Sequence, residues 1–266
     1  MSILVADKLR KSFNGRTVVQ DVSLTVNEAE TVGLLGRNGA GKTTSFRMTI
    51  GMIEPDAGKV FFAGEEVTGL PMYRHARRGM GYLSQEPSAF QRMTCEQNLL
   101  AILETVPGMS RKARRKRAAE LLDQFGLTKK TRELARTCSG GERRKLEIAR
   151  ALVTSPKLVL LDEPFSGVDP IAVEDLQREV RNLNREHGIA VLITDHNVQQ
   201  TLSVCDRAYI VDEGRILAEG TPQQLINNQM VRRVYLGSLF KGDEFDHARG
   251  DHASGGRDDR VSGGVA

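Results

Sequence analysis

This sequence has few cysteines, no long apolar run and only a small excess of positive charge. Its 266 residues include three cysteines, Cys95, Cys138 and Cys205, and none of them forms a Cys-x-x-Cys pair. This scatter argues against a disulfide framework or a zinc site and suits a reducing compartment. No stretch approaches the ~18 apolar residues that span a bilayer. The N-terminus also lacks the order of segments of a secretory signal, so we expect a soluble chain.

The charge is close to balanced, with a formal net charge of +4. Such a mild excess permits contact with nucleic acid or anionic lipid but does not require either. Basic residues concentrate in the run from Arg111 to Arg117. Charge blocks on helices are usually solvated faces, and no aromatic residue interleaves with this one to stack on bases. We therefore predict a solvated helix surface, open to anionic lipid headgroups, and expect no nucleic-acid partner.

The order of patterns along the chain predicts an α/β fold. Residues 1–35 alternate β-branched runs with turn residues, and the Asn-Gly pair after Phe13 indicates an antiparallel hairpin. Later apolar runs, such as LVLL before Asp162, are typical of parallel strands covered on both faces. Residues 95–155 space apolar positions by three and four, which indicates a helical insertion. We predict one domain over residues 1–240 and a disordered polar tail over 241–266.

The most specific motif follows the run TVGLL. It fits the pattern G-x-x-x-x-G-K-[ST], with a predicted strand before it and a helix after it. Glycines allow backbone N–H groups to surround phosphate oxygens, and the helix N-terminus adds a positive dipole. We expect Lys42 to reach the β- and γ-phosphates and Thr43 to bind Mg²⁺. A glycine-rich turn that holds nothing is the alternative. The predicted nucleotide-binding residues of this loop are Gly36, Arg37, Asn38, Gly39, Ala40, Gly41, Lys42, Thr43 and Thr44.

Two adjacent carboxylates could complete such a site. The stretch KLVLLDEP places Asp162 and Glu163 where a predicted strand ends. Nucleotide hydrolysis needs a carboxylate for the metal and a group that orients the attacking water. We predict that Asp162 binds Mg²⁺ through water and that Glu163 orients or deprotonates the nucleophile. Alone, an apolar run followed by Asp-Glu could simply end a strand.

A second glycine pair opens a helix in the stretch TCSGGERRKLEIARAL. Ser139 followed by Glu142 predicts an ordinary capping box. Gly140 and Gly141 are costly there, at about 1 kcal/mol each relative to alanine, so we also expect their N–H groups to approach an anion. The five residues from Cys138 to Glu142 resemble the LSGGQ signature of the ATP-binding cassette (ABC) ATPases.

The resemblance covers about residues 3–240 and implies a P-loop fold with an antiparallel β subdomain and a helical insertion. Gln85 matches the Q-loop of the family and His196 its switch histidine. The resemblance implies that Gln85 contacts the metal and that Gln85 and His196 act in hydrolysis beside Glu163. Phe13 occupies the place of the adenine-stacking aromatic, although a core residue is the alternative there. The remaining ATP contacts that the resemblance implies are Ser139, Gly140, Gly141, Glu142 and the D-loop residue Asp169.

The resemblance also implies partners. Signature residues of one subunit complete the γ-phosphate pocket of the other, so we expect a head-to-tail homodimer that moves two membrane permeases from the cytoplasmic face of the inner membrane. Phe90 and Arg92 are the candidate permease contacts, and the alternative is that Phe90 packs into the local core. Cys138 replaces the usual leucine of the signature, and Glu142 the usual glutamine. A thiol beside a helix N-terminus can be reactive, which makes Cys138 a candidate for redox sensitivity.

Three stretches narrow the resemblance: YLSQEPSAFQRMTCEQNL, LITDHNVQQTL and VRRVYLGSLF. They are similar to the ATPase subunits of lipopolysaccharide exporters. The order Asp195-His196-Asn197 favours this subgroup, because importers of branched-chain amino acids more often carry Glu-His-Asp. The ATPase of such an importer stays the nearest alternative. A soluble ABC ATPase that acts on ribosomes or DNA, and a binding module with an inactive site, are further alternatives.

Overall fold

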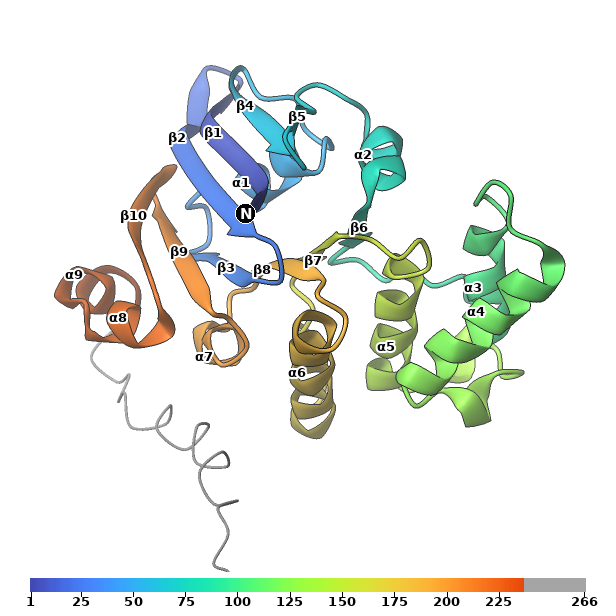
Figure 1. Cartoon of the computed structure of the whole chain (residues 1–266). Coiled ribbons are helices and arrows are strands. Elements are labelled where there is room, and N and C mark those ends of the chain that lie inside the picture. The colour runs from blue at the N-terminus through green and yellow to red at the C-terminus, as the bar shows by residue number, and fades with distance from the viewer. Residues whose placement is uncertain (237–266) are drawn as a thin grey trace, which may run out of the picture.

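The computed structural model describes residues 1–236, so the tail predicted at 241–266 lies outside the described residues. Figure 1 shows a mixed sheet with helices on both of its faces. Its strands are β1 (Ser2–Phe13), β2 (Arg16–Asn27), β3 (Thr31–Gly36), β4 (Ala57–Phe62), β5 (Glu65–Glu66), β6 (Met80–Leu83), β7 (Leu158–Asp162), β8 (Ala190–Thr194), β9 (Arg207–Asp212) and β10 (Arg215–Gly220). The α-helices are α1 (Lys42–Thr49), α2 (Met72–Arg78), α3 (Cys95–Leu103), α4 (Arg111–Gln124), α5 (Gly140–Ala151), α6 (Pro170–Arg185), α7 (Val198–Leu202), α8 (Pro222–Asn227) and α9 (Gln229–Val231). Two 3-10 turns, η1 (Thr128–Lys130) and η2 (Ala135–Thr137), and the π-helical η3 (Arg232–Leu236) complete the described elements.

The N-terminal hairpin has the predicted antiparallel pairing. β1 and β2 pair from Phe13↔Arg16 at the turn to Ser2↔Asn27 at the far end. Asn14 and Gly15 both adopt positive φ, 48° and 79°, which is the backbone of a type I′ turn. β4 and β5 extend this antiparallel part on the other side of β1.

The other half of the sheet is parallel over five neighbouring strands, in the order β9-β3-β8-β7-β6. All residues of β3, β7 and β8 are buried, which confirms the prediction of parallel strands covered on both faces. Side chains alternate between two cores: Val159 and Leu161 pack with α5 and α6, whereas Leu158 and Leu160 pack with α1. α1 and α5 therefore lie against opposite faces of the sheet.

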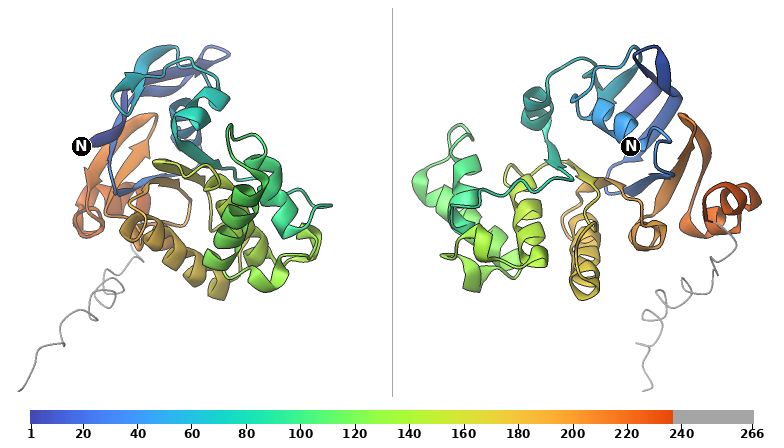
Figure 2. Two further views of the ribbon diagram at one scale, coloured as in Figure 1. Left: turned by 45° about the vertical axis from the view of Figure 1, so that its right-hand side comes forward. Right: turned by 180° about the vertical axis from the view of Figure 1, so that it is seen from behind.

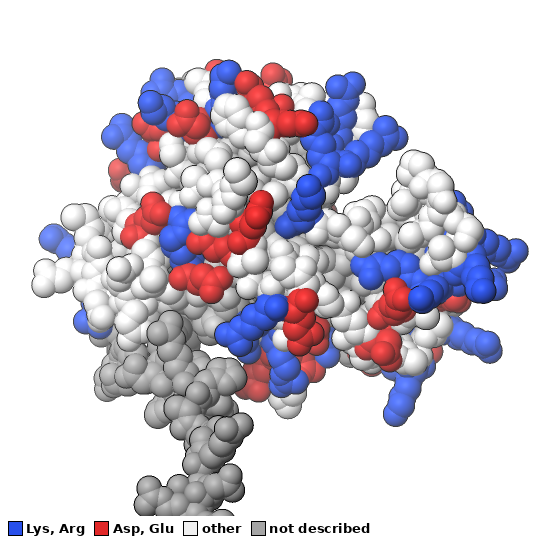
Figure 3. Space-filling model, viewed as in Figure 1, with Lys and Arg blue, Asp and Glu red and all other residues white. Residues whose placement is uncertain are grey.

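The helices predicted in residues 95–155 form as α3, α4 and α5. Figure 2 shows them gathered in one lobe beside the sheet. α3 begins at a complete capping box of Thr94 and Gln97, and the Ser110 hydroxyl caps α4. The basic run of residues 111–117 lies at the start of α4, and Figure 3 shows Lys and Arg side chains concentrated over the regions of α2 and α4. Within residues 1–236, no helix combines the length and apolar character needed to cross a bilayer.

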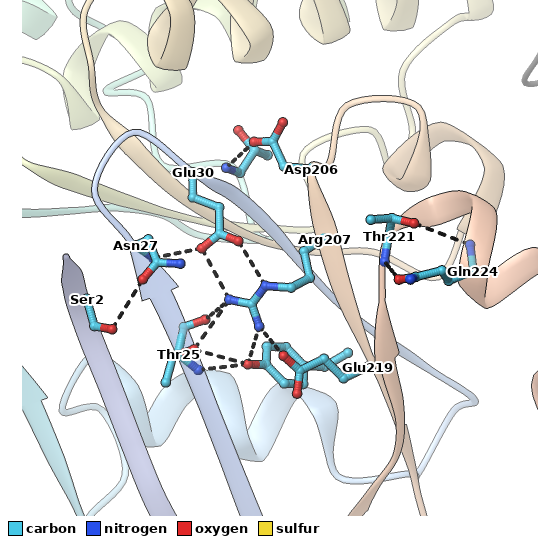
Figure 4. A network of polar contacts seen from close by, with 11 residues as sticks. Ser2, Thr25, Asn27, Glu30, Asp206, Arg207, Glu219, Thr221 and Gln224 are labelled. Atoms are coloured by element: carbon cyan, nitrogen blue, oxygen red, sulfur yellow. Dashed lines mark hydrogen bonds and ion pairs between the residues drawn. The ribbon is translucent and has the colours of Figure 1, made fainter.

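A polar network ties the hairpin β9–β10 to β2 (Figure 4). The Arg207 guanidinium lies 2.9 Å from Glu30 and also donates to Tyr209, Glu219 and the carbonyl of Thr25. The hydrogen bond to Glu30 raises the pKa of Arg207 above its usual range, so this cation stays charged. Beyond this hairpin, Thr221 and Gln224 form a complete capping box at the start of α8.

Candidate nucleotide-binding site

The glycine-rich loop leaves β3 and enters α1, as predicted. Its glycines fit close to neighbouring backbone: a Cβ on Gly36 would lie 2.2 Å from the carbonyl oxygen of Val211, and one on Gly41 would lie 2.8 Å from that of Val18. Gly41 also has a φ of 98°, in the left-handed region that favours glycine. Among the described residues no side chain caps α1, so its first N–H groups can bind an anion at the mouth of the loop.

Lys42 lies folded back over this loop. Its Nζ donates to the carbonyl oxygens of Gly36 at 2.6 Å and Arg37 at 3.1 Å, and the residue is 6% exposed. Burial lowers the pKa of Lys42, while the charges of Glu163 and Asp195 act in the opposite direction. The loop thus holds a buried ammonium group against its own carbonyl oxygens.

Asp162 ends β7 and is completely buried. Its Oδ2 is 3.4 Å from the Tyr82 hydroxyl and 4.0 Å from Nε of Arg47, whereas its Oδ1 is buried with no hydrogen-bond partner in the part of the chain that the structure describes. Burial raises the pKa of Asp162, and Arg47 partly offsets that shift. A buried carboxylate oxygen without a partner is what a hard cation such as Mg²⁺ would satisfy. Within residues 1–236 no cluster of three or more His, Cys, Asp or Glu side chains forms a self-contained metal site.

Glu163 meets the side chains of two other strand ends. Its Oε2 accepts a hydrogen bond from Nε2 of Gln85 at 2.8 Å and lies 3.3 Å from Nδ1 of His196. Gln85 follows β6 and His196 follows β8, so the three predicted catalytic side chains come together at the carboxyl ends of neighbouring parallel strands. Glu163 itself has a φ of 48°, a costly conformation for a non-glycine residue, and such conformations concentrate at functional sites. A hollow of about 520 Å³ lies beside this group, lined by segments 165–168 and 195–200.

The signature residues lie elsewhere. Ser139 and Glu142 form the predicted capping box at the start of α5, with Glu142 N 3.2 Å from Ser139 Oγ and Ser139 N 2.8 Å from Glu142 Oε2. Ser139 and Gly140 are exposed, and α5 lies across the sheet from α1. Asp169 caps α6 through its hydrogen bond with Ala172 N. The signature therefore does not close over the phosphate loop of its own chain.

Gly141 has a packing role that the sequence did not reveal. A Cβ at this position would lie 2.6 Å from Cβ of Ala172, at the start of α6. Its lack of a side chain is thus required by the contact between α5 and α6, independently of any anion. Gly140 has open space where its Cβ would be, so only the prediction of an approaching anion accounts for it.

We predict that Gly141→Ala lowers stability by about 1–3 kcal/mol, as overpacking does, and pushes α5 away from α6. Ala172→Gly in the same chain should restore the thermal midpoint, because it removes the colliding methyl group. Gly140→Ala is the matched control and should leave the midpoint unchanged or slightly higher. Thermal unfolding of the four chains is the measurement. A double variant as unstable as Gly141→Ala alone would contradict the packing role.

Of the remaining predicted residues, Phe13, Phe90 and Arg92 lie on the surface, whereas Cys138 is buried. Phe13 is 43% exposed at the end of β1, and its described ring contact is with Nζ of Lys11, 5.7 Å from the ring centroid. Phe90 is 46% exposed and Arg92 is exposed, so Phe90 does not pack into the local core. Cys138 is buried, with its Sγ 3.6 Å from that of Cys95. This burial argues against the reactive thiol predicted at Cys138, since a reagent must reach the sulfur.

The residues that support the carboxylates were not apparent from the sequence. Arg47 and Tyr82 approach Asp162, and a buried ion pair of Arg144 and Glu147 lies beneath Glu163. Tyr82 lies on β6, the neighbour of β7, and no sequence motif singles it out. Glu147 interrupts the apolar spacing of its helix, and this was the signal available for the ion pair.

Comparison with known proteins agrees with this geometry. The family model described as "ABC transporter" matches residues 19–166. The chain belongs to the ABC transporter family, and it is an ATPase whose hydrolysis of ATP is coupled to transport. It is 54% identical over 241 residues to the lipopolysaccharide export system ATP-binding protein LptB of Haemophilus influenzae, covering 91% of this chain and 100% of that protein. It is 50% identical to the protein of the same name from Escherichia coli K12, with the same coverage. The crystal structure of the ADP conformation of an ATP-binding cassette of an ABC transporter matches with a TM-score of 0.80 and 29% identity, covering 89% of this chain and 99% of that one.

Proposed function

We propose that this chain is the ATP-hydrolysing subunit of a lipopolysaccharide export transporter. The observation that carries the proposal is the identity of 54% and 50% to two export ATPases along the whole of their length. Transporter ATPases of this family act with membrane partners. Those partners would be two permease subunits, and the chain would work at the cytoplasmic face of the inner membrane without touching the cargo.

The separated motifs support a head-to-tail homodimer. Ser139 and Gly140 are exposed at the start of α5, and α5 lies on the face of the sheet opposite to α1, which follows the phosphate loop. Free N–H groups at that helix start could bind the γ-phosphate of ATP held by a second copy, whose own signature would reciprocate. Asp169, exposed at the cap of α6, lies beside the same helix start and would enter the same interface.

In this proposal the residues that follow each strand have separate roles in binding and hydrolysis. Lys42 and the N–H groups of residues 36–44 hold the phosphates. Glu163 accepts a proton from the attacking water, and His196, 3.3 Å from its carboxylate, contacts the γ-phosphate. Mg²⁺ supplies positive charge that neutralises the phosphate oxygens. Asp162, with its unpartnered buried oxygen, would hold that ion together with Thr43 and Gln85. Phe13 would stack on adenine at the edge of the site.

Phe90 and Arg92 would contact the permeases. The Phe90 ring is exposed, yet its backbone is fixed: the side chain of the buried Asn98 bonds both Phe90 N, at 2.8 Å, and Phe90 O, at 3.1 Å. A rigidly held exposed aromatic ring is typical of an interface anchor.

We expect Phe90→Ala to weaken assembly with the permeases by roughly 30-fold or more, because hot-spot truncations cost at least about 2 kcal/mol and each 1.4 kcal/mol is about tenfold in Kd. ATP affinity of the isolated chain should not change, since the ring has no described contact with the phosphate loop. Co-purification with the permeases and equilibrium binding of ATP measure the two effects. Met93→Ala, an exposed apolar residue of the same segment, is the matched control. Normal assembly of the Phe90 variant would refute the contact.

The test of the whole proposal is to isolate the tagged chain from membranes of its source in mild detergent and identify what accompanies it. Permeases of the lipopolysaccharide-export type would support the assignment. Permeases for amino acids would support a transport ATPase but overturn the assignment to lipopolysaccharide export. Ribosomes or DNA, without a membrane protein, would overturn the transport assignment.

A further inference from the structure

One face of α5 carries three charged side chains, of which two are buried and the third is partly buried. Arg144, Glu147 and Arg150 recur at intervals of three residues, and the first two are 6% and 4% exposed. Nη1 of Arg144 lies 3.1 Å from Oε2 of Glu147. Breaking a buried ion pair is costly, yet such a pair often stabilises no more than an apolar pair of the same volume. Stability alone therefore does not explain why this pair is present.

The Arg144 guanidinium binds the backbone on either side of the proposed catalytic carboxylate. Nη2 donates to the carbonyl oxygens of Asp162 at 3.1 Å and Glu163 at 2.9 Å, and Nε donates to that of Pro164 at 3.1 Å. Nη1 donates to the carbonyl oxygen of Ser84 at 2.9 Å. A planar guanidinium has five donors in fixed directions, so these four carbonyls are held in one geometry. Burial lowers the pKa of Arg144 and the charge of Glu147 opposes that shift.

Glu147 and Arg150 bind the segment that leads from Gln85 to the exposed Phe90. Oε1 of Glu147 accepts hydrogen bonds from Ser88 N at 2.7 Å and Ala89 N at 3.1 Å. Arg150 donates to the carbonyl oxygen of Ser88, and its guanidinium carbon lies 4.5 Å from the centroid of the Phe90 ring. The segment 84–90 is therefore connected to the backbone at Asp162 and Glu163 by the ion pair of Arg144 and Glu147, in addition to its own backbone.

We infer that Arg144 and Glu147 are a positioning pair for ATP hydrolysis, which transmits displacements of the segment 84–90 to the backbone that carries Glu163. This inference rests on the proposed roles of Glu163 and of Phe90 as a permease contact. A shift of the segment changes the hydrogen bonds of Glu147 and Ser84, and Arg144 cannot follow it without altering its bonds to the carbonyls of Asp162 and Glu163. Neither side chain touches ATP in this role.

Two variants test the pair. Arg144→Lys keeps the charge but replaces the planar fork with a single ammonium group, which cannot reach four carbonyls together. Glu147→Gln keeps an oxygen for Ser88 N and Ala89 N and removes the charge that pairs with Arg144. Arg143→Lys is the matched control, because Arg143 is the adjacent residue and its guanidinium donates to Cys138 O on another side of the helix.

The measurement is kcat and KM for ATP, with kcat expressed per chain that binds ATP. Counting only binding-competent chains removes any loss through misfolding, and Glu147→Gln carries the test if Arg144→Lys does not fold. We expect both variants to lower kcat by roughly 10- to 100-fold, since small misplacements of reacting groups have effects of this size. KM should change less than about twofold. Unchanged kcat in both variants, or an equal loss in Arg143→Lys, would overturn the inference.

Transmission is tested by repeating the kinetics in complex with the permeases. The ratio of kcat in the complex to kcat of the isolated chain should move toward one in both variants, whereas a merely structural role would leave this ratio at its wild-type value. A wild-type ratio would overturn transmission. The isolated-chain kinetics do not depend on the cargo, so a wrong assignment to lipopolysaccharide export would leave that part of the result intact.

Discussion

Glu163→Gln should bind ATP, form the closed dimer and hydrolyse roughly 10²–10⁴-fold more slowly, the range expected when a general base is lost. Glutamine has the size of glutamate and can accept the hydrogen bond from Gln85 through its amide oxygen, so the arrangement at the strand ends should persist. It cannot accept a proton from water at neutral pH. The positive φ of 48° at this position is as costly for glutamine as for glutamate, so the substitution adds no new backbone strain.

Two measurements check this expectation: steady-state release of phosphate, and the apparent mass of the variant with and without ATP. A variant that accumulates as an ATP-dependent dimer would separate the chemical step from binding. Glu86→Gln is the control, because Glu86 is an exposed carboxylate immediately after Gln85. Undiminished turnover by Glu163→Gln would assign the base to another group.

Lys42→Met should lose most ATP binding. The buried ammonium group is replaced by an apolar side chain of similar length, so the fold is preserved while the charge-assisted bonds to phosphate are lost. Hydrogen bonds to charged groups contribute about 1.5–3 kcal/mol each, so one such bond alone corresponds to a rise of about 10- to 100-fold in the Kd for ATP. The carbonyls of Gly36 and Arg37 would also lose their donor, which should loosen the loop.

Arg37→Met provides the matched control. It removes one positive charge from the same loop, but the Arg37 side chain is exposed, so the general attraction for an anion changes equally in both variants. Equilibrium binding of ATP to each chain is the measurement. If both variants weaken binding to the same extent, the effect of Lys42 is one of net charge and not of direct contact.

Sequence patterns predicted the site residues that lie at the ends of buried strands. The motif residues at the centre of the site lie at the end of an apolar run or within two residues of it: Gly36 ends β3, Asp162 ends β7 and His196 is the second residue after β8. Local periodicity predicts such strands, and parallel strands bring their carboxyl ends to one edge. The arrangement of Gln85, Glu163 and His196 was therefore predictable as a meeting of three segments, although their distances were not.

Other features depended on contacts between distant segments and could not be predicted. Arg144 lies in a run of basic residues and looks like any solvated charge, because its acceptors at Ser84 and at 162–164 are remote in sequence. α2 was missed because His75 is its one buried residue, so it has no apolar periodicity to detect. For Gly141 the sequence suggested that glycine is needed for an anion at the helix start. The structure adds a second cause, the close packing against Ala172 on α6, which is remote in sequence.

The position of β3 within the sheet also constrains when the site can exist during synthesis. Its two neighbours are β8 and β9, and Gly214, at the turn that follows β9, donates through its N–H to the carbonyl oxygen of Ala40 in the phosphate loop. A ribosome has made the loop long before it makes either neighbour. Contacts between segments so distant in the chain form late, because the intervening loop must close first. A nascent chain that has emerged only through α6 has every residue of its phosphate loop but no finished cradle for ATP, so nucleotide cannot assist folding until β8 and β9 have also been made.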